Sequence, residues 1–249
     1  MLVQSDYHIH AAFYRLKKEG DIPGPTALEQ LTAARNAGSQ LVGIVEHGNT
    51  AVKHPFSCLE DLSREFHSAN FPRENAFLGV ESDLSEDGSD HCGPEGRKKL
   101  QLDYVIGSVH CSPAVIPDFS EYLVSEYKRI TNALKYNSNI DIIGHPFGEG
   151  IRWERKEIIA RWEWSLIPEH FLDEILRLAR ETGKALEINR CDFTDPVYRD
   201  FINRIRDEKI CFEVGSDAHA TEGTVEAFSR TRELEKSGFQ EQYHWSPLK

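Results

Sequence analysis

Short apolar segments, each about as long as a β-strand, recur along the chain and are separated by longer amphipathic stretches. Several of these segments, including AFLGV and IDIIG, are continuously apolar rather than alternating, which is typical of parallel strands covered on both faces. The pattern predicts strands at residues 3–8, 40–45, 76–81, 104–109, 140–144, 185–188 and 211–214.

Helical patterns lie between most of these segments. Thr26 and Glu29 have the spacing of a capping box, and Gly38 is placed to end the helix that they begin. Asp195 precedes Pro196, which predicts a capped helix start, and longer helices are expected at 120–137, 169–182 and 224–237. Strands that alternate with helices indicate an α/β fold with a parallel sheet, either closed into a barrel or doubly wound. Periodicity alone does not distinguish these two forms.

Two stretches interrupt this alternation. Residues 82–96 are polar and rich in glycine, so we interpret them as a mobile loop. Residues 152–168 contain Trp153, Trp162 and Trp164, which we expect to pack against the wall of the fold. A lid over the substrate is the alternative interpretation of this segment.

Composition narrows the class of protein. The chain has 249 residues, of which 39% are hydrophobic and 28% charged, and no linker divides it, so we expect one domain over residues 1–249. The net charge of −12 argues against tight binding of long nucleic acid, which depends on Lys and Arg. No apolar run is long enough to cross a membrane. No signal-peptide pattern is visible and the five cysteines form no C-x-x-C pair, so we expect a cytoplasmic protein.

Histidines and acids gather where the predicted strands end. Six of the seven strands deliver such a residue to their carboxyl end, and in parallel α/β folds this edge is where active sites form. A single histidine after a strand is usually structural, and H-x-H alone is a weak signal. The convergence of many such residues at one rim is the stronger evidence. The residues are His8, His10, His47, Glu81, His110, His145, Asp217 and His219.

These side chains are suited to metal binding. Imidazole and carboxylate ligands favour Zn²⁺, Mn²⁺ or Fe²⁺, and the absence of cysteine from the set argues against a closed structural zinc site. Eight ligands are too many for one ion, so the sequence predicts two or three metals. Glu81 is the natural bridge, because one carboxylate can give an oxygen to each of two ions.

The order of these motifs resembles that of the PHP (polymerase and histidinol phosphatase) family. The likeness rests on H-I-H, E-H after the second strand, the lone Glu81, G-S-V-H, G-H-P and S-D-A-H, and it runs from His8 to His219. It implies a distorted, TIM-like (β/α)7 barrel with two or three Zn, Mn or Fe ions at its rim. It also implies phosphoester hydrolysis, in a protein similar to histidinol phosphatases.

The resemblance further implies how the ligands are shared. The first metal would be held by His8, His10, Glu81 and Asp217. The second would be held by Glu81, His110 and His145, and the third would involve His47 and His219.

The chain departs from the family pattern at two points. Glu46 precedes His47 where the family more often has Asp. Histidinol phosphatase-like members also place a further ligand shortly after H-x-H, where this chain offers only Glu19 or Asp21. The third metal is therefore the one for which the sequence supplies the fewest ligands.

Two adjacent divalent ions can activate a shared water for attack on phosphorus. In this hypothesis Glu81, Asp217 and His219 are the catalytic residues, and either His219 or a water protonates the leaving oxygen. Arg190, which directly follows the sixth strand, is the first candidate for binding the phosphate. Arg152 and Arg15 are further candidates, and Glu187 is expected to orient a ligating histidine.

The predicted function is hydrolysis of a small phosphomonoester, with histidinol phosphate as the most specific suggestion. A nucleotide phosphatase or an exonuclease on short oligonucleotides is a related alternative. A non-catalytic metal-binding module and metal-dependent C–N hydrolysis are alternatives from other classes. The expected partner is a small phosphorylated molecule rather than long nucleic acid or a membrane, and the sequence leaves the oligomeric state open.

Overall fold

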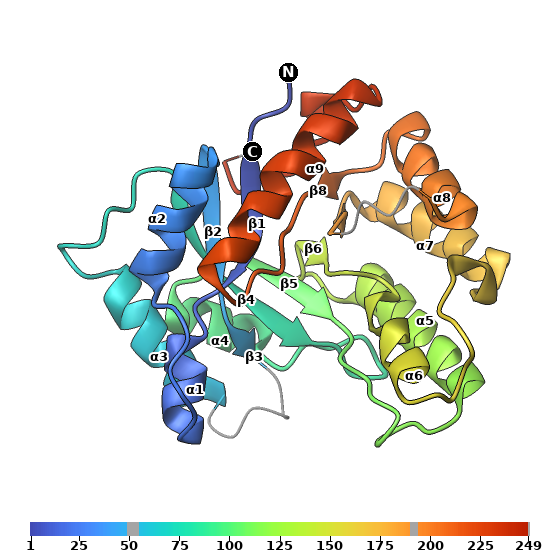
Figure 1. The fold of residues 1–249 in the computed structure, drawn as a ribbon, viewed down its shortest axis with the longest axis horizontal. Helices are drawn as coiled ribbons and strands as arrows, with labels where there is room; N and C mark the ends of the chain where they lie inside the picture. Colours follow the sequence, from blue (N-terminus) through green and yellow to red (C-terminus); the bar gives the residue numbers. More distant parts are fainter. Residues whose placement is uncertain (49–54, 190–193, 249) are drawn as a thin grey trace.

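A computed structural model describes residues 1–48, 55–189 and 194–248 of the chain. Its centre is a curled parallel sheet with helices packed around the outside (Figure 1). The sheet order is β1-β2-β4-β5-β6-β7-β8, and the short β3 pairs with β4 beside this path. The strands are β1 (Ser5–His10), β2 (Leu41–Val45), β3 (His47–Gly48), β4 (Ala76–Asp83), β5 (Tyr104–Ser108), β6 (Ile142–Ile143), β7 (Ala185–Glu187) and β8 (Phe212–Glu213).

The helices mostly lie between successive strands, as expected for right-handed β/α units. They are α1 (Phe13–Glu19), α2 (Ala27–Ala37), α3 (Pro55–Phe66), α4 (Gly93–Leu100), α5 (Phe119–Tyr136), α6 (Ile151–Arg155), α7 (Glu169–Thr182), α8 (Pro196–Asp207) and α9 (Val225–Lys236). No helix within the described ranges is both long and apolar enough to cross a bilayer.

The two ends of the sheet meet at a narrow seam. Ile9 of β1 forms an isolated parallel bridge with Ala218, which lies beyond β8, and the amide of His10 donates to the carbonyl of Ala218 at 2.9 Å. The sheet is therefore a distorted TIM-like barrel. This form answers the question that periodicity left open.

Aromatic residues fill one part of the barrel interior. The hydroxyl of Tyr104 on β5 donates to the carbonyl of Tyr7 on β1 at 2.6 Å, across a sheet in which β2 and β4 lie between these strands. Gly79 on β4 makes room for this ring, since a Cβ at Gly79 would meet Tyr104 Cε1 at 2.7 Å. Trp245 packs against the same cluster.

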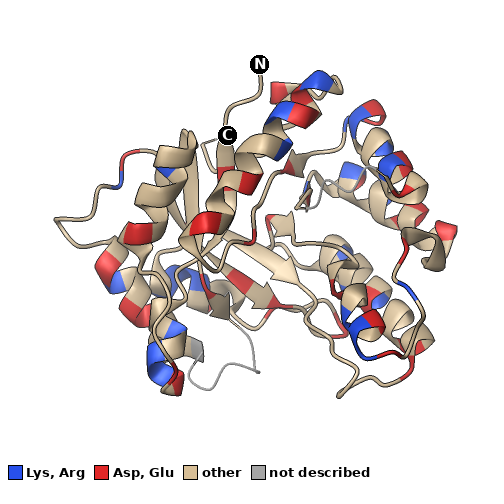
Figure 2. Cartoon of the chain, viewed as in Figure 1, with Lys and Arg blue, Asp and Glu red and all other residues tan. Residues whose placement is uncertain are grey.

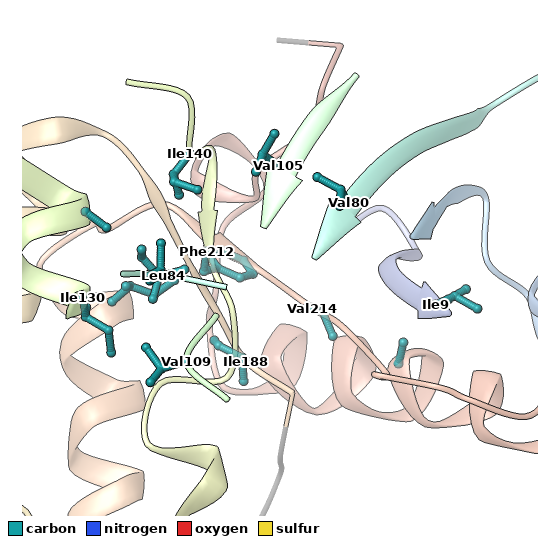
Figure 3. Close-up of a cluster of buried hydrophobic side chains, with 14 of the residues drawn as sticks. Ile9, Val80, Leu84, Val105, Val109, Ile130, Ile140, Ile188, Phe212 and Val214 are labelled. Carbon is teal, nitrogen blue, oxygen red and sulfur yellow. The ribbon is translucent and has the colours of Figure 1, made fainter. Parts of the chain in front are cut away.

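The opposite faces of the strands pack against the helices. Val80 and Val105 belong to a large buried cluster that also includes Ile130 of α5 and Phe212 of β8 (Figure 3). Side chains thus alternate along each strand between the interior and the helical layer. This alternation decides which residues at the strand ends can reach the centre of the barrel.

The predicted elements agree with the structure in most places. The capping box at Thr26 and Glu29, the left-handed Gly38 and the Asp195 cap are all present, and α7 has its predicted bounds. Trp153 is fully buried, as the packing interpretation requires. Strand β1 begins and ends about two residues later in the sequence than predicted, at Ser5 and His10. Strands β6 and β8 are shorter than predicted.

The prediction of one loop over residues 82–96 is wrong. Strand β4 continues to Asp83, Leu84 forms a bridge with Asp90, and α4 begins at Gly93. The start of α4 carries a proline in its first turn but lacks a side-chain cap, because the N-cap residue is Cys92. The polar composition therefore concealed a helix start.

Candidate metal centre

Glu81 is the hub of the predicted cluster. It lies on β4 with no exposed surface, where strand alternation turns it into the barrel. Its Oε1 atom lies 2.7 Å from Nε2 of His145, 3.2 Å from Nε2 of His110 and 3.4 Å from Nε2 of His8. One oxygen thus faces three imidazoles from three different parts of the rim.

The second oxygen of Glu81 faces the other side of the cluster. Its Oε2 atom lies 2.8 Å from Nδ1 of His47 and 3.3 Å from Nε2 of His10. A carboxylate that divides its two oxygens between separate groups of histidines has the geometry expected of a bridging ligand.

Asp217 and His219 complete the cluster from beyond β8. Asp217 Oδ1 lies 3.3 Å from Nε2 of His10 and 3.6 Å from Nε2 of His8. The Nε2 atoms of His219 and His47 are 3.3 Å apart. All eight residues predicted from the sequence as metal ligands therefore converge at one place.

The donor atoms fit divalent metals. Among the described residues, three groups have ligand atoms that all lie within 4.8 Å of one another and could hold an ion. Glu81 Oε2 and His47 Nδ1 are also buried, and although they lie 2.8 Å apart neither makes a hydrogen bond of normal geometry, which is costly unless a cation satisfies them. The groups are His8, His10 and Asp217; His47, Glu81 and His110; and His10, His47 and His219.

The charges of the cluster are strongly coupled. Burial raises the pKa of Glu81, but the positive histidines His110 and His8 outweigh burial and hold it well below its usual value. The positive charge of His10 and burial together lower the pKa of His219 to about 4. Such perturbed groups concentrated at one rim are typical of functional sites.

Further carboxylates orient the histidines from behind. Glu187 Oε1 lies 2.7 Å from Nδ1 of His8, as expected from the sequence. Asp83 Oδ1 lies 2.5 Å from Nδ1 of His110, a contact that the sequence analysis missed. The position of Asp83 two residues after Glu81 could have indicated this contact, because alternate residues of a strand share a face.

The predicted phosphate-binding arginines have different surroundings. Arg15 on α1 lies 3.3 Å from Glu46, whose same oxygen is 3.4 Å from Nδ1 of His10, so Arg15 borders the cluster. Arg152 pairs instead with Glu149, and among the described contacts none joins it to the cluster. Arg190 lies outside the described residues.

The two acids considered as additional ligands do not join the cluster. Glu19 lies 3.5 Å from Arg15, and Asp21 is exposed. Neither belongs to the three metal-binding groups of the described chain.

One side of the cluster is open. The side chains of His219 and Asp217 are 43% and 36% exposed, whereas those of His8, His10 and Glu81 are fully buried. Lys and Arg lie outside the strands, mainly on the surrounding helices, whereas bands of Asp and Glu also mark the central strands (Figure 2). A substrate would therefore approach from the side of His219 and Asp217.

Known proteins similar to this chain include two kinds of enzyme. The DNA polymerase/3'-5' exonuclease PolX of Bacillus subtilis is 26% identical over 230 residues, which are 88% of this chain but 35% of PolX. A probable phosphatase of Thermoanaerobacter sp. (strain X514) is 28% identical over 213 residues, covering 79% of this chain and 73% of the relative. A probable phosphatase of Caldanaerobacter subterraneus is 28% identical over 211 residues, covering 78% and 70%. No protein-family model matches the chain.

Proposed function

Taking the chain as a PHP-family phosphoesterase, we propose that it hydrolyses a small phosphomonoester at the Glu81 cluster. The observation that carries this proposal is the position of Glu81, whose two oxygens face five imidazoles. The relatives named as probable phosphatases, which this chain matches over most of their length, support a monoester substrate. Histidinol phosphate is the most specific candidate within this class.

The buried and the exposed side chains of the cluster have different roles in this proposal. When bound, divalent ions would activate a water and stabilise charge on the phosphoryl oxygens. Glu81 holds the buried histidines together, while Asp217 and His219 present donor atoms at the open side. His219 is oriented by its Nδ1 atom, which lies 3.0 Å from the carbonyl oxygen of Asp217 and leaves Nε2 facing the cluster.

Of the eight clustered residues, Asp217 is the one carboxylate that a phosphate would meet at this side. Only two of the eight clustered side chains, Glu81 and Asp217, are carboxylates, and Glu81 is buried beneath the histidines. Arg15 lies at the border of the cluster and is the described arginine best placed to reach a phosphate. The acidic net charge of the chain therefore does not oppose a phosphorylated substrate locally.

The number of tightly bound metals depends on whether enough ligands are available for the third one. His47 and His219 offer their Nε2 atoms at the third position, but His10 turns its Nε2 atom towards Asp217 and Glu81. No carboxylate completes this position within the described chain. We expect two tightly bound metals, with a third held weakly.

A second candidate function is removal of nucleotides from short oligonucleotides. It is favoured by the similarity to PolX, which is named as a 3'-5' exonuclease. This chain spans about a third of the length of PolX, so exonuclease activity of this chain by itself is a proposal.

One experiment separates these functions. Phosphate release would be measured from a panel of phosphomonoesters, including histidinol phosphate and nucleotides, with manganese- or zinc-loaded protein. His8→Ala removes a buried ligand, and His170→Ala, on the exposed surface of α7, serves as the matched control. Turnover that is lost only in His8→Ala supports the proposal.

No release from any monoester, together with shortening of labelled oligonucleotides, would favour the exonuclease. Inactivity on both substrate classes would contradict both functions and favour a non-catalytic metal-binding module.

A further inference from the structure

The loop that carries His145 has a strained backbone. His145 and Phe147 have φ angles of 26° and 57°, in a region that residues other than glycine rarely occupy. The strain occurs directly beyond β6, where Nε2 of His145 approaches Glu81 to 2.7 Å. Surrounding contacts must hold such a conformation, because the loop alone would relax.

Two buried carboxylates supply these contacts. Oε2 of Glu187, on β7, accepts a hydrogen bond of 2.6 Å from the amide of His145. Oε1 of Glu126, on α5, accepts a hydrogen bond from the amide of Phe147. The side chains of both glutamates are almost fully buried. Burying a carboxylate is costly unless it accepts hydrogen bonds, so both acids are held in place by the loop that they stabilise.

Glu187 also contacts a second histidine of the cluster. Its other oxygen, Oε1, lies 2.7 Å from Nδ1 of His8 on β1. In neutral His8, a proton on Nδ1 is donated to Glu187, and the Nε2 lone pair, on the side of Glu81 and Asp217, is then available to a cation. One side chain therefore fixes His8 directly and His145 through its backbone.

The absence of a side chain at Gly215 permits this arrangement. A Cβ atom built on Gly215 would collide with Oε1 of Glu187 and would lie 2.8 Å from Cβ of His8. Glycine at this position therefore leaves the space that the Glu187 carboxylate occupies. Substitution of Gly215 would displace Glu187 and also crowd His8, although it removes no predicted ligand.

We propose that Glu187 and Glu126 are positioning residues that hold the His145 loop in its strained conformation, and that Glu187 also links the ring of His8 to the backbone of His145. The inference rests on the proposed metal-dependent function. Its consequence is asymmetric. Glu126 supports only His145, which the family resemblance assigns to the second metal. Glu187 supports His145 and also His8, which belongs to the group of His8, His10 and Asp217.

Zinc binding to the full chain tests this asymmetry without any substrate. Competition with a chromophoric chelator would give the affinity of each zinc, and elemental analysis would give the zinc content per chain. Glu126→Ala should weaken the binding of one zinc ion by about 10- to 100-fold and leave the affinity for the other unchanged, as expected when a group that orients a ligand is removed. Glu187→Gln and Gly215→Ala should weaken the binding of both zinc ions.

Glu126→Gln is the conservative variant, because its amide oxygen can still accept from Phe147. It should restore most of the lost affinity. Glu174→Gln, at an ion pair with Lys135 on the surface, is the matched control and should bind zinc as the unchanged protein does. Near-ultraviolet circular dichroism of each metal-free variant identifies those that misfold, and Glu126→Gln and Gly215→Ala remain informative if Glu126→Ala does not fold.

Unchanged zinc affinities in folded Glu126→Ala and Glu187→Gln would overturn the inference, as would equal weakening of both zincs by Glu126→Ala. If the unchanged protein binds zinc but hydrolyses no ester, only the proposed function fails. If it binds no zinc, both proposals are wrong.

Discussion

Oδ1 of Asp83 lies 2.5 Å from Nδ1 of His110, so a carboxylate on β4 fixes the ring of a histidine that follows β5. The other ring nitrogen of His110 faces Glu81 at 3.2 Å. A carboxylate behind a metal-ligating imidazole sets its tautomer and increases its basicity. The pair links the end of one strand to the next strand of the barrel.

Asp83→Asn should weaken metal binding at His110 by about 10- to 100-fold, because the amide accepts less strongly than the carboxylate. Chelator competition would measure the change. Asp87→Asn is the matched control, since Asp87 is exposed and bonds only to Ser89 among the described contacts. Equal affinities for the Asp83 variant and the control would contradict this role for Asp83.

Removal of metal should destabilise the fold. At a free metal concentration 100 times the dissociation constant, one site stabilises the native state by about 2.7 kcal/mol, so chelation should lower Tm by roughly 5–10 °C. Thermal unfolding with and without a chelator measures this shift. The shift should be smaller in His8→Ala, which removes a ligand of one of the two expected metals, and a chelator effect of the same size in that variant would refute the assignment.

Glu126 should make the stability of the metal-free protein depend on pH. Burial raises its pKa from 4.5 to about 7, so the folded state favours the neutral carboxyl group. The resulting stability is fully present below pH 4.5 and is lost as pH rises through 7. Relative to the unchanged protein, Glu126→Gln should therefore gain on the order of 3 kcal/mol across this range.

Urea unfolding of both metal-free proteins at several pH values would measure the difference for Glu126→Gln. A difference that does not vary with pH would show that Glu126 titrates normally.

Arg15→Ala should raise the KM for a phosphomonoester by about 10-fold or more, because a hydrogen bond between charged groups is lost. The metal content should stay unchanged, since Arg15 contacts Glu46 and Glu19 rather than the histidines. Steady-state kinetics beside Arg152→Ala gives the comparison, because Arg152 pairs with Glu149 away from these contacts. A larger effect from Arg152 would reverse this order of the two arginines.

The sequence was most informative for the candidate metal ligands that lie at the carboxyl ends of the parallel strands. His8, His110 and Asp217 could be predicted at one rim because parallel strands bring their carboxyl ends together. Their distances from Glu81 could not be predicted, because the curl of the sheet decides which oxygen faces which ring. Glu126 gave no signal either, since it lies within the amphipathic pattern of α5 and reaches the loop only after the helix packs.

The seam of the barrel also determines when the site can assemble during folding. Ser216 and His8, which contact one another across it, are 208 positions apart in the chain. Closing so long a loop is entropically costly, and contacts of this separation form late. The group of His8, His10 and Asp217 therefore forms only once residues near both ends of the barrel have been brought together. Metal binding at this group would report the final closure of the barrel, and a nascent chain that lacks residues beyond β8 would not acquire it.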